Sequence, residues 1–446
     1  MAIAANIEQT EVQTAGALLP DGVLLELLRD SSRPEGVQVL NWKGRVLKIG
    51  PRIEHAGIGY APVSLDAIGL SAMALPSSVA HEESPRELFT AVERLLSNTL
   101  GQPEASVNLM TLCVLASWIP EALPIAPLLW IVTSPTSPKH ATLQLLGALC
   151  RRPLVLTGVR RGDLCSLPWH LHPTLVLDEP ETRPQLQQLL QSSSRREANI
   201  QDGKRTVNLY GSKIILSREL PREPSFASDS LRVILMPKYG RRGFLDQKPQ
   251  QQIGEEFQNR LLGYRLRNIA KVRVPQFDVS HLTLPMQEIA RAFGAVAVGD
   301  KELEEKVLAL VTALEEEVRS ERSNTTDAIL IETLLFFSHK RDQREVRVME
   351  LAQKASAIRA GRGSGEEVSP ETAGWRLKHL GIPTRRVGSA GNGVKFTDSI
   401  RRLVHQLGIV HDVRALPTAL DRACPYCKEF GQDASSSATS SGGSPK

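Results

Sequence analysis

The 446 residues are too many for one hydrophobic core, so we expect the chain to form roughly two to four domains. Hydrophobic residues make up 41% and charged residues 23%, the proportions of a soluble globular protein. The net charge of +5 is small for this length, but basic residues gather in two zones, with nine Lys and Arg against three Asp and Glu over 238–273 and nine against four over 355–402. These zones favour a polyanion such as DNA as a partner, although solvated helix faces would look the same.

The cysteines, the N-terminus and the apolar stretches argue against a disulfide-rich, secreted or membrane-spanning protein. Three of the five cysteines lie in apolar runs, so the sequence indicates neither a disulfide framework nor an oxidising compartment. The N-terminus contains Glu8 and Glu11 and no apolar run after a basic patch, unlike a signal peptide. The longest apolar stretch, 105–132, holds Glu121 and three prolines, whereas a membrane span needs about 20 uninterrupted apolar residues. We therefore expect a cytoplasmic protein without membrane contact.

The chain begins with regions that carry little chemistry. Residues 1–20 are polar and small and predict a disordered tail. A mixed region is expected over 21–104, with a helical turn or two at 23–28 and a pair of strands over 38–49. Helices are predicted at 83–100 and 107–118, the second nearly all apolar and therefore buried.

The centre alternates between short apolar strands and helices. Strands are predicted at 128–133, 153–157, 174–177, 213–217 and 231–236, with a helix at 141–149. Continuous apolar strands separated by helices predict a parallel sheet covered on both faces, and we assign this core to 105–245. Helices at 254–269, 284–293 and 302–318 predict a helical lid or linker over 246–325, and another helix is expected at 326–337. The segment 414–446 is expected to be a flexible tail containing a Cys-x-x-Cys motif.

A turn that follows the first central strand has the outline of a phosphate-binding loop. Such a loop has the form G-x-x-x-x-G-K-[ST], in which backbone N–H groups surround phosphate oxygens and the hydroxyl holds magnesium. Here the turn reads SPTSPKHAT over 134–142. In one register Lys139 stands at the second glycine, His140 at the lysine and Ala141 at the hydroxyl. In the other, Lys139 is the lysine but Pro138, which has no N–H, replaces the glycine and His140 the hydroxyl. Both registers disfavour tight Mg-ATP binding.

The strand at 174–177 ends in two carboxylates, Asp178 and Glu179. In a working ATPase the aspartate supports magnesium and the glutamate activates water. The acidic pair follows the degenerate loop after an intervening helix and strand, and this spacing in the sequence strengthens its interpretation as the magnesium- and water-activating pair of an ATPase. The alternative is two acids that merely end a strand.

With these features the chain resembles the P-loop ATPase domain of primase- and helicase-like proteins of phages and other mobile elements, with their bacterial relatives. The similarity covers about 105–410 and rests mostly on patterned hydrophobicity, the strand ending in Asp178-Glu179 being its strongest motif. The stretches that carry it are 118–121, 126–135, 173–179, 210–215 and 232–236. The resemblance implies an α/β fold: a P-loop NTPase-like parallel sheet with flanking helices, then a helical region and a C-terminal winged-helix domain.

The resemblance also implies roles for individual residues. Asp178 and Glu179 would be catalytic, Ser217 would lie near the polar sensor of the fourth strand, and Arg232 would match an arginine finger. For Arg232 the alternative is a surface arginine at a strand start. The expected nucleotide-binding residues are Ser134, Thr136, Ser137, Lys139, His140 and Thr142. Residues 137–141 depart from the phosphate-loop pattern. This departure puts in doubt both the binding of ATP and magnesium as cofactors and ATP hydrolysis itself.

Residues 326–413 look like a winged helix. A helix with cations on one side is predicted at 370–380, followed by strands at 384–387 and 393–397 around a turn-rich tip and a helix at 399–407. In such a fold a helix can enter the major groove while the wing touches phosphate. The alternative is a winged helix used for protein contacts. The candidate DNA-binding residues are Arg376, Lys378, Arg385, Arg386 and Lys395.

Cys424 and Cys427 have the spacing of a zinc knuckle. A structural zinc ion normally needs four ligands, and His405 and His411 are the nearest candidates in the sequence. A redox pair is disfavoured because no thioredoxin-like strand and helix surround the motif.

Three functions stay open. The first is a hydrolysis-impaired ATPase-like protein associated with DNA, or with a partner or another copy in a replication or mobile-element assembly. The second is an active but atypical ATPase in which Lys139 rescues phosphate binding. The third is a regulator that binds DNA through the winged helix. Whether the chain is an enzyme is therefore undecided.

Overall fold

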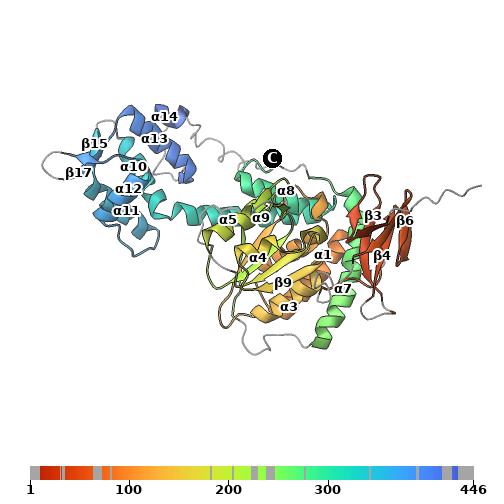
Figure 1. Ribbon diagram of the computed structural model, residues 1–446. Coiled ribbons are helices and arrows are strands. Elements are labelled where there is room, and N and C mark those ends of the chain that lie inside the picture. Colours follow the sequence, from red (N-terminus) through yellow and green to blue (C-terminus); the bar gives the residue numbers. More distant parts are fainter. Residues whose placement is uncertain are drawn as a thin grey trace, which may run out of the picture. The chain divides into compact units, whose positions relative to one another are not determined.

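The computed structural model describes residues 11–30, 32, 36–63, 73–80, 83–180, 183–202, 205–221, 230–237, 247–275, 278–340, 343–387, 391–413 and 424–429 (Figure 1). The chain divides into two compact units, Met1–Thr312 and Ala313–Lys446. Among the described residues no helix is both long and apolar enough to cross a membrane.

Unit 1 begins with two small β-sheets, ordered β2-β3-β4-β5 and β1-β7-β6. Val23, Leu25, Val39 and Ile53 form a small core to which both sheets contribute. The strands are β1 (Glu11–Thr14), β2 (Ala17–Leu18), β3 (Leu24–Arg29), β4 (Val37–Lys43), β5 (Val46–Gly50), β6 (Ile53–His55) and β7 (Ile58–Pro62). The hairpin of β4 and β5 confirms the strand pair expected over 38–49, and Gly44, at φ +62°, supplies the left-handed turn residue.

Two expectations for this region are wrong. Residues 11–18, expected to be disordered, form β1 and β2, while residues 1–10 lie outside the described residues. Residues 23–28, expected to be helical, belong largely to β3, in which Leu24–Leu28 are all buried. Leu25 and Leu27 share one face of β3, Leu25 in the core between the two sheets and Leu27 in the cluster with Leu171, and Glu26 is buried on the other face. A strand covered on both faces shows no alternation, so its apolar run cannot be told from a short helix.

The central sheet confirms the predicted parallel core. It comprises β8 (Leu128–Val132), β9 (Pro153–Thr157), β10 (Thr174–Asp178), β13 (Lys213–Ser217) and β14 (Leu231–Ile234). All four pairings are parallel, and the spatial order is β14-β8-β13-β10-β9. The carboxyl ends of strands that are far apart in the sequence therefore lie at the same end of the sheet.

Helices cover both faces of this sheet, as Figure 1 shows for α4 and α3 on opposite sides of β9. Trp130, Leu175, Leu177 and Ile215 point to the face on which α5 packs through Leu186 and other leucines. The opposite face is contacted by α2 and α3. The helices are α1 (Pro85–Leu100), α2 (Glu104–Ser117), η3 (Pro120–Ala122), α3 (Lys139–Leu149), α4 (Arg161–Cys165), η4 (Trp169–Leu171) and α5 (Pro184–Ser192). A hairpin of β11 (Asn199–Asp202) and β12 (Arg205–Asn208) follows.

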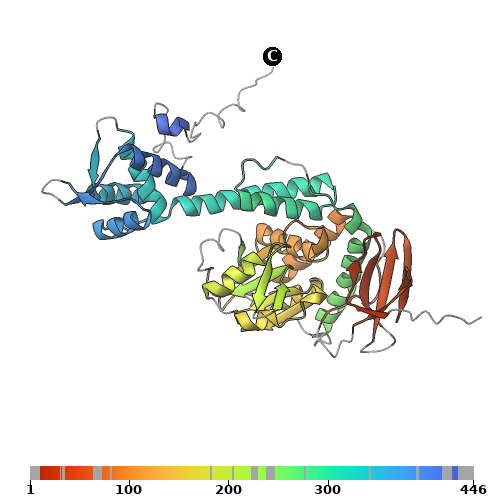
Figure 2. The same ribbon diagram turned by 45° about the horizontal axis from the view of Figure 1, so that its top comes forward.

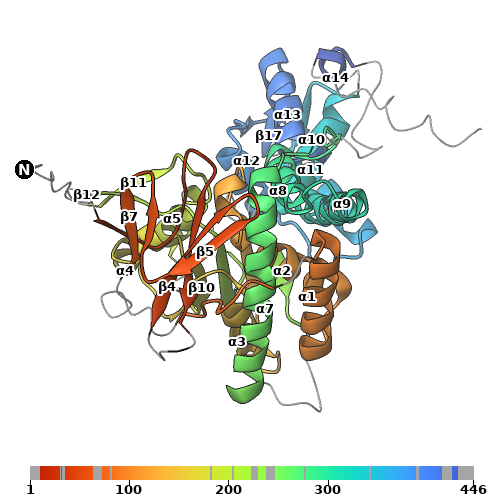
Figure 3. The same ribbon diagram turned by 90° about the vertical axis from the view of Figure 1, so that its right-hand side faces the viewer.

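The rest of unit 1 is helical, as predicted for the region after the sheet. The elements are α7 (Gln247–Asn268), η5 (Ile269–Lys271), α8 (Leu284–Val296) and the first part of α9 (Lys301–Ser323). The views in Figures 1 and 3 both place α7 alongside the N-terminal strands, where Arg265 reaches β3.

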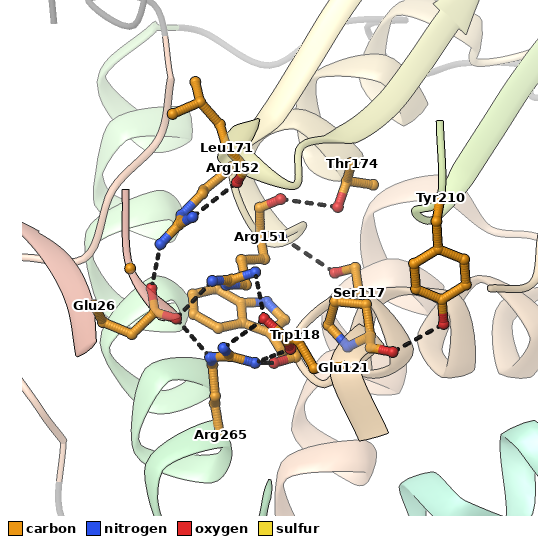
Figure 4. Close-up of polar contacts among 12 residues, drawn as sticks. Glu26, Ser117, Trp118, Glu121, Arg151, Arg152, Leu171, Thr174, Tyr210 and Arg265 are labelled. Atoms are coloured by element: carbon orange, nitrogen blue, oxygen red, sulfur yellow. Dashed lines mark hydrogen bonds and ion pairs between the residues drawn. The ribbon is translucent and has the colours of Figure 1, made fainter. Parts of the chain in front are cut away.

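A buried ion-pair network joins the N-terminal strands to the central core (Figure 4). Glu26 of β3 accepts hydrogen bonds from Arg151 (2.6 Å), Arg152 (2.7 Å) and Arg265 (2.7 Å). Arg265 also donates two bonds to the Glu121 carboxylate, at 2.7 and 2.8 Å. Burial alone would raise the pKa of Glu26, but the three guanidinium groups lower it to about 2. Glu26 is therefore a charged residue that fixes β3 to segments more than a hundred positions away.

In unit 2, helices pack on a three-stranded antiparallel sheet of order β15-β17-β16 (Figure 2). Val346 and Val394 face a core that Leu330, Leu351 and Leu377 share. The elements are α10 (Thr326–Ser338), β15 (Glu345–Arg347), α11 (Val348–Gly361), α12 (Pro370–His379), β16 (Arg385–Arg386), β17 (Asn392–Lys395), α13 (Asp398–Val410) and α14 (Pro425–Glu429). The predicted order of three helices, hairpin and helix is confirmed, whereas β15 and α14 were not predicted. Residues 425–429, placed in a flexible tail by the sequence, are helical.

Candidate functional site

The ends of three parallel strands bring the candidate nucleotide residues together. β13 lies between β8 and β10, with Ser217 opposite Val132 and Leu216 opposite Asp178. The turn after β8 and the acidic pair that ends β10 therefore flank the end of β13. Ligands of open α/β sheets bind at such carboxyl ends.

The turn after β8 is closed by its own hydrogen bonds. The Ser137 hydroxyl donates to the Ser134 carbonyl oxygen at 2.8 Å and accepts from the Ser134 N–H at 3.0 Å. The N–H groups of Ser137 and Lys139 donate to the carbonyl oxygens of Ser134 and Ser137, at 3.1 and 2.8 Å. Pro135 and Pro138 have no N–H. Within the described structure this leaves Thr136 as the one residue of 134–139 whose N–H is not engaged inside the turn, so the loop does not present a converging set of phosphate donors.

Lys139, the first residue of α3, lies between the two carboxylates that end β10. Its Nζ is 2.6 Å from Asp178 Oδ1 and 3.0 Å from Glu179 Oε1. The Lys139 and Asp178 side chains are only 17% and 14% exposed, so this pair is better shielded from water than a surface ion pair. Partial burial would lower the pKa of Lys139, but its hydrogen bonds to Asp178 and Glu179 raise it above the ordinary value. A charged ammonium group thus occupies the position between the carboxylates.

The backbone of Glu179 is left-handed, with φ +48°. This conformation costs a residue with a side chain roughly 1 kcal/mol or more and is found where surrounding structure enforces it. Here the Glu179 N–H donates to the Leu216 carbonyl oxygen at 2.8 Å, and the carboxylate accepts from the Arg218 N–H at 3.4 Å. Arg218 Nε also lies 3.4 Å from Glu179 Oε1. Sequence reasoning missed Arg218, although its position directly after the strand ending in Ser217 was a usable signal.

The remaining loop residues are not brought to the acidic pair. His140 is exposed, and Ala141, the hydroxyl position in one register, is buried. The buried Thr142 hydroxyl donates to the Pro138 carbonyl oxygen at 2.9 Å, which ties it into the helix start. Ser134 and Thr136 contact each other through their hydroxyl oxygens at 3.2 Å. The residue that reaches the carboxylates is therefore Lys139, as in the register that makes it the loop lysine.

Ser217 and Arg232 occupy different places relative to this edge. Ser217 ends β13 beside the turn, is buried, and accepts a hydrogen bond from the Glu219 N–H at 3.2 Å. Arg232 lies opposite Trp130, two positions before the end of β14, or about 7 Å along the strand. The fold therefore places Ser217 at the carboxyl ends of the strands, beside the turn, and places Arg232 before the carboxyl end of its own strand.

Exposed cations line one face of the small sheet in unit 2. Arg385 and Arg347 are both opposite Gly393, and Lys395 is opposite Glu345. Because Val346 and Val394 point to the core, Arg347 and Lys395 point the other way, and both are exposed. Gly393 carries no side chain between the two arginines, and a Cβ there would meet the Val346 carbonyl oxygen at 2.5 Å. The sequence did not single out Arg347 because the three-residue strand β15 was not predicted.

The helix α12 offers fewer free cations than expected. Arg376 lies 3.5 Å from Asp327 and stacks over Trp375 at 5.0 Å, so it is held by unit 2 itself. Lys378 is exposed, as is Trp375, whose ring packs on that of His379 with 3.8 Å between centroids. Arg386 is also exposed. The exposed cations among the candidates are thus Lys378, Arg385, Arg386 and Lys395.

Cys424 and Cys427 lie beside two histidines, His339 and His405, with all four ligand atoms within 4.8 Å of one another. His411, the other histidine suggested by the sequence, follows the last residue of α13 and is not in this group. The structure brings His405, which the sequence suggested, beside the two cysteines, and it adds His339, which the sequence did not single out.

Comparisons with known proteins do not assign a family. No family profile and no curated protein matches the sequence. Among solved structures, the apo C-terminal region of NrS-1 is similar with 12% identity and a TM-score of 0.35, covering 84% of this chain and 96% of that one. Drosophila ORC bound to DNA has 14% identity and a TM-score of 0.18 over 80% of this chain and 95% of that one. The Aeropyrum pernix ORC1 protein in complex with DNA also has 14% identity and a TM-score of 0.18, over 75% and 95%. At these scores none of the likenesses assigns a function.

Proposed function

We propose that this chain is a P-loop-ATPase-like, DNA-associated protein whose nucleotide site is closed by Lys139 and does not hydrolyse ATP. The observation that carries the proposal is the Lys139 ammonium group, 2.6 Å from Asp178 and 3.0 Å from Glu179. Magnesium in an ATPase is held by carboxylates, a hydroxyl and substrate phosphates. Here an ammonium group neutralises the carboxylates, and the hydroxyl position holds Ala141 or His140.

The turn supports the same proposal through its backbone. A phosphate cradle needs several N–H groups that point at one anion. In the turn over 134–139, two residues are prolines and three N–H groups are bonded internally. Opening it for a triphosphate would break these bonds before any phosphate contact formed. In this proposal Ser217 and Glu179 keep the places of a sensor and a water-activating carboxylate without their chemistry.

An active but atypical ATPase is the second candidate. It is favoured by the positive charge of Lys139, which a nucleotide phosphate would attract. A lysine that is held by Asp178 and Glu179 in the absence of nucleotide could turn to a phosphate and release both carboxylates to magnesium. Arg232 would then serve as an arginine finger toward a neighbouring copy. The two candidates make opposite predictions for nucleotide turnover.

For unit 2 we propose a winged helix that contacts DNA phosphates. Support comes from the order α10, β15, α11, α12, β16, β17 and from the exposed cations on the sheet and on α12. Arg385, Lys395 and Arg347 would touch the backbone, while α12 would lie toward a groove with Trp375 and Lys378 outward. Unit 1 would serve assembly with a partner or a second copy.

Turnover and binding of ATP by the full chain test the proposal. We expect wild-type protein and Glu179→Gln to show the same background release of phosphate in the presence of magnesium, with and without DNA. In magnesium-free buffer, binding of a fluorescent ATP analogue should be equally weak for wild type and Lys139→Met, because the closed turn offers the phosphates no cradle in either protein. Turnover that Glu179→Gln abolishes, together with tight binding that Lys139→Met weakens, would establish the active ATPase instead.

A further inference from the structure

Four soft and borderline ligands from three segments of unit 2 converge on one point. His405 Nε2 lies 3.0 Å from His339 Nε2 and 3.4 Å from Cys424 Sγ, and Cys427 Sγ lies 3.3 Å from His339 Nε2. His339 directly follows α10, His405 is within α13, and the two cysteines stand just before and within α14. The cluster is mostly buried, with Cys424, Cys427 and His405 each less than a tenth exposed.

These distances match the edges of a zinc tetrahedron. With zinc–sulfur bonds of about 2.3 Å and zinc–nitrogen bonds of about 2.0–2.1 Å, tetrahedral ligands stand about 3.3–3.8 Å apart. The three separations given above, 3.0–3.4 Å, lie at or slightly below the lower end of this range, and all six lie within 4.8 Å. Small outward movements of the side chains would therefore accommodate the ion.

The surroundings of His405 prepare it as a ligand. Its Nδ1 lies 2.6 Å from the Arg401 carbonyl oxygen. A carbonyl oxygen can only accept a hydrogen bond, so the nitrogen that faces it must carry the proton. The proton therefore stays on Nδ1, and Nε2 presents a lone pair to the centre of the cluster. Metal-bound histidines are commonly oriented in this way by a carbonyl oxygen behind the ring.

Contacts around α14 hold the cysteines in place without the metal. The Tyr426 hydroxyl donates to Asp398 at 2.9 Å, and Arg402 pairs with Glu429 at 2.7 Å, so α14 is seated on α13 from both sides of Cys427. The Lys428 N–H donates to the Cys424 carbonyl oxygen at 3.3 Å, which closes the turn between the two cysteines. The Cys-x-x-Cys turn thus presents both sulfur atoms on the side that faces the histidines.

We propose that His339, His405, Cys424 and Cys427 form a structural zinc site that fixes α14 to the end of α10 and to the middle of α13. Four protein ligands complete the tetrahedron and leave no position for water, which is the arrangement of structural rather than catalytic zinc. Two thiolates balance the charge of Zn²⁺, so the ion adds no net charge to the buried site. The cysteines then serve as ligands and not as a redox pair.

Metal content of the full-length protein tests this site. Protein expressed with added zinc and dialysed against metal-free buffer should hold about one zinc per chain by elemental analysis. Cys424→Ser and His339→Ala should each lose most of this zinc. His411→Ala is the matched control, because His411 is near in sequence but outside the cluster, and it should keep about one zinc.

A second measurement covers variants that fold poorly. Wild-type protein stripped of metal under reducing conditions and titrated with Co²⁺ should develop the thiolate-to-metal absorption of tetrahedral cobalt, which zinc then displaces. Wild-type protein without zinc and without this absorption would overturn the proposal, as would a His339→Ala variant that keeps its zinc. A Cys424–Cys427 disulfide in protein purified under reducing conditions would also overturn it, in favour of a redox pair.

Discussion

Lys139 Nζ lies 2.6 Å from Asp178 Oδ1, so the first residue of α3 neutralises the carboxylate that ends β10. An ammonium group and a divalent cation cannot both occupy the space between Asp178 and Glu179. The pairing therefore predicts how the site responds to metal.

Lys139→Ala should create a divalent-cation site. In protein whose cysteine cluster is already zinc-loaded, we expect Mn²⁺ to bind the variant at least about tenfold more tightly than wild type, a difference of about 1.4 kcal/mol. Electron paramagnetic resonance of free Mn²⁺ during titration measures it. His140→Ala, at the exposed neighbouring position, should behave as wild type. If Lys139→Ala binds no more Mn²⁺ than wild type, the ammonium group is not what excludes the metal.

Arg385 and Arg386 should contribute to DNA binding through phosphate interactions. Neutralising one phosphate accounts for about 0.9 in the slope of log affinity against log salt on duplex DNA, so the double alanine variant should have a slope smaller by up to about 1.8. The decrease should be similar for unrelated sequences. Fluorescence anisotropy at several salt concentrations measures both quantities. Arg45→Ala, which changes an exposed arginine of unit 1, is the control. An unchanged slope in the double variant would leave unit 2 as a protein-binding module.

The sequence was sufficient for the central sheet but not for the pairing of Lys139 with the acidic strand. Apolar runs such as 128–132 and 213–217 predict strands because length and flanking residues are distinctive. Lys139 and Glu179 are 40 positions apart, and they meet because β13 lies between β8 and β10. His339 and Cys427 are 88 positions apart, and their contact depends on how α10, α13 and α14 pack. The strand β3 was mistaken for a helix because its buried run does not alternate, and the arginine partners that allow Glu26 to be buried within it come from distant segments.

Glu26→Gln should destabilise unit 1. The substitution leaves Arg151, Arg152 and Arg265 buried with only Glu121 to balance three positive charges. Breaking a buried ion pair in this way costs about 3–5 kcal/mol. Urea unfolding followed by circular dichroism gives the loss of free energy. Glu54→Gln makes the same chemical change at an exposed carboxylate and should have little effect. Equal stability of the two variants would show that the network contributes little.

The same carboxylate predicts acid sensitivity. The pKa of Glu26 falls from 4.5 in the unfolded chain to about 2 in the folded protein, so the folded state binds its proton later as pH falls. Its contribution is complete above pH 4.5 and is lost as pH falls from there toward 2. Melting temperatures of wild type should therefore fall more steeply over this window than those of Glu26→Gln. Parallel curves for the two proteins would contradict the assignment.

Lys213 predicts a second pH dependence of the same sign, at neutral to alkaline pH. This lysine is buried at the start of β13 and donates to the carbonyl oxygens of Gly211 (2.7 Å) and Ser193 (3.0 Å), and burial lowers its pKa from 10.5 to about 7. Between these values the unfolded chain holds a proton that the folded protein lacks, so this residue makes stability rise with pH from about 7 toward 10.5. Lys213→Met removes the contribution, and the difference in melting temperature between wild type and variant should grow in favour of wild type across this range. Other groups titrate there too, but they are common to both proteins and cancel in the difference. A difference that stays constant from neutral to alkaline pH would mean that Lys213 keeps its proton in the folded state, held by the two carbonyl oxygens.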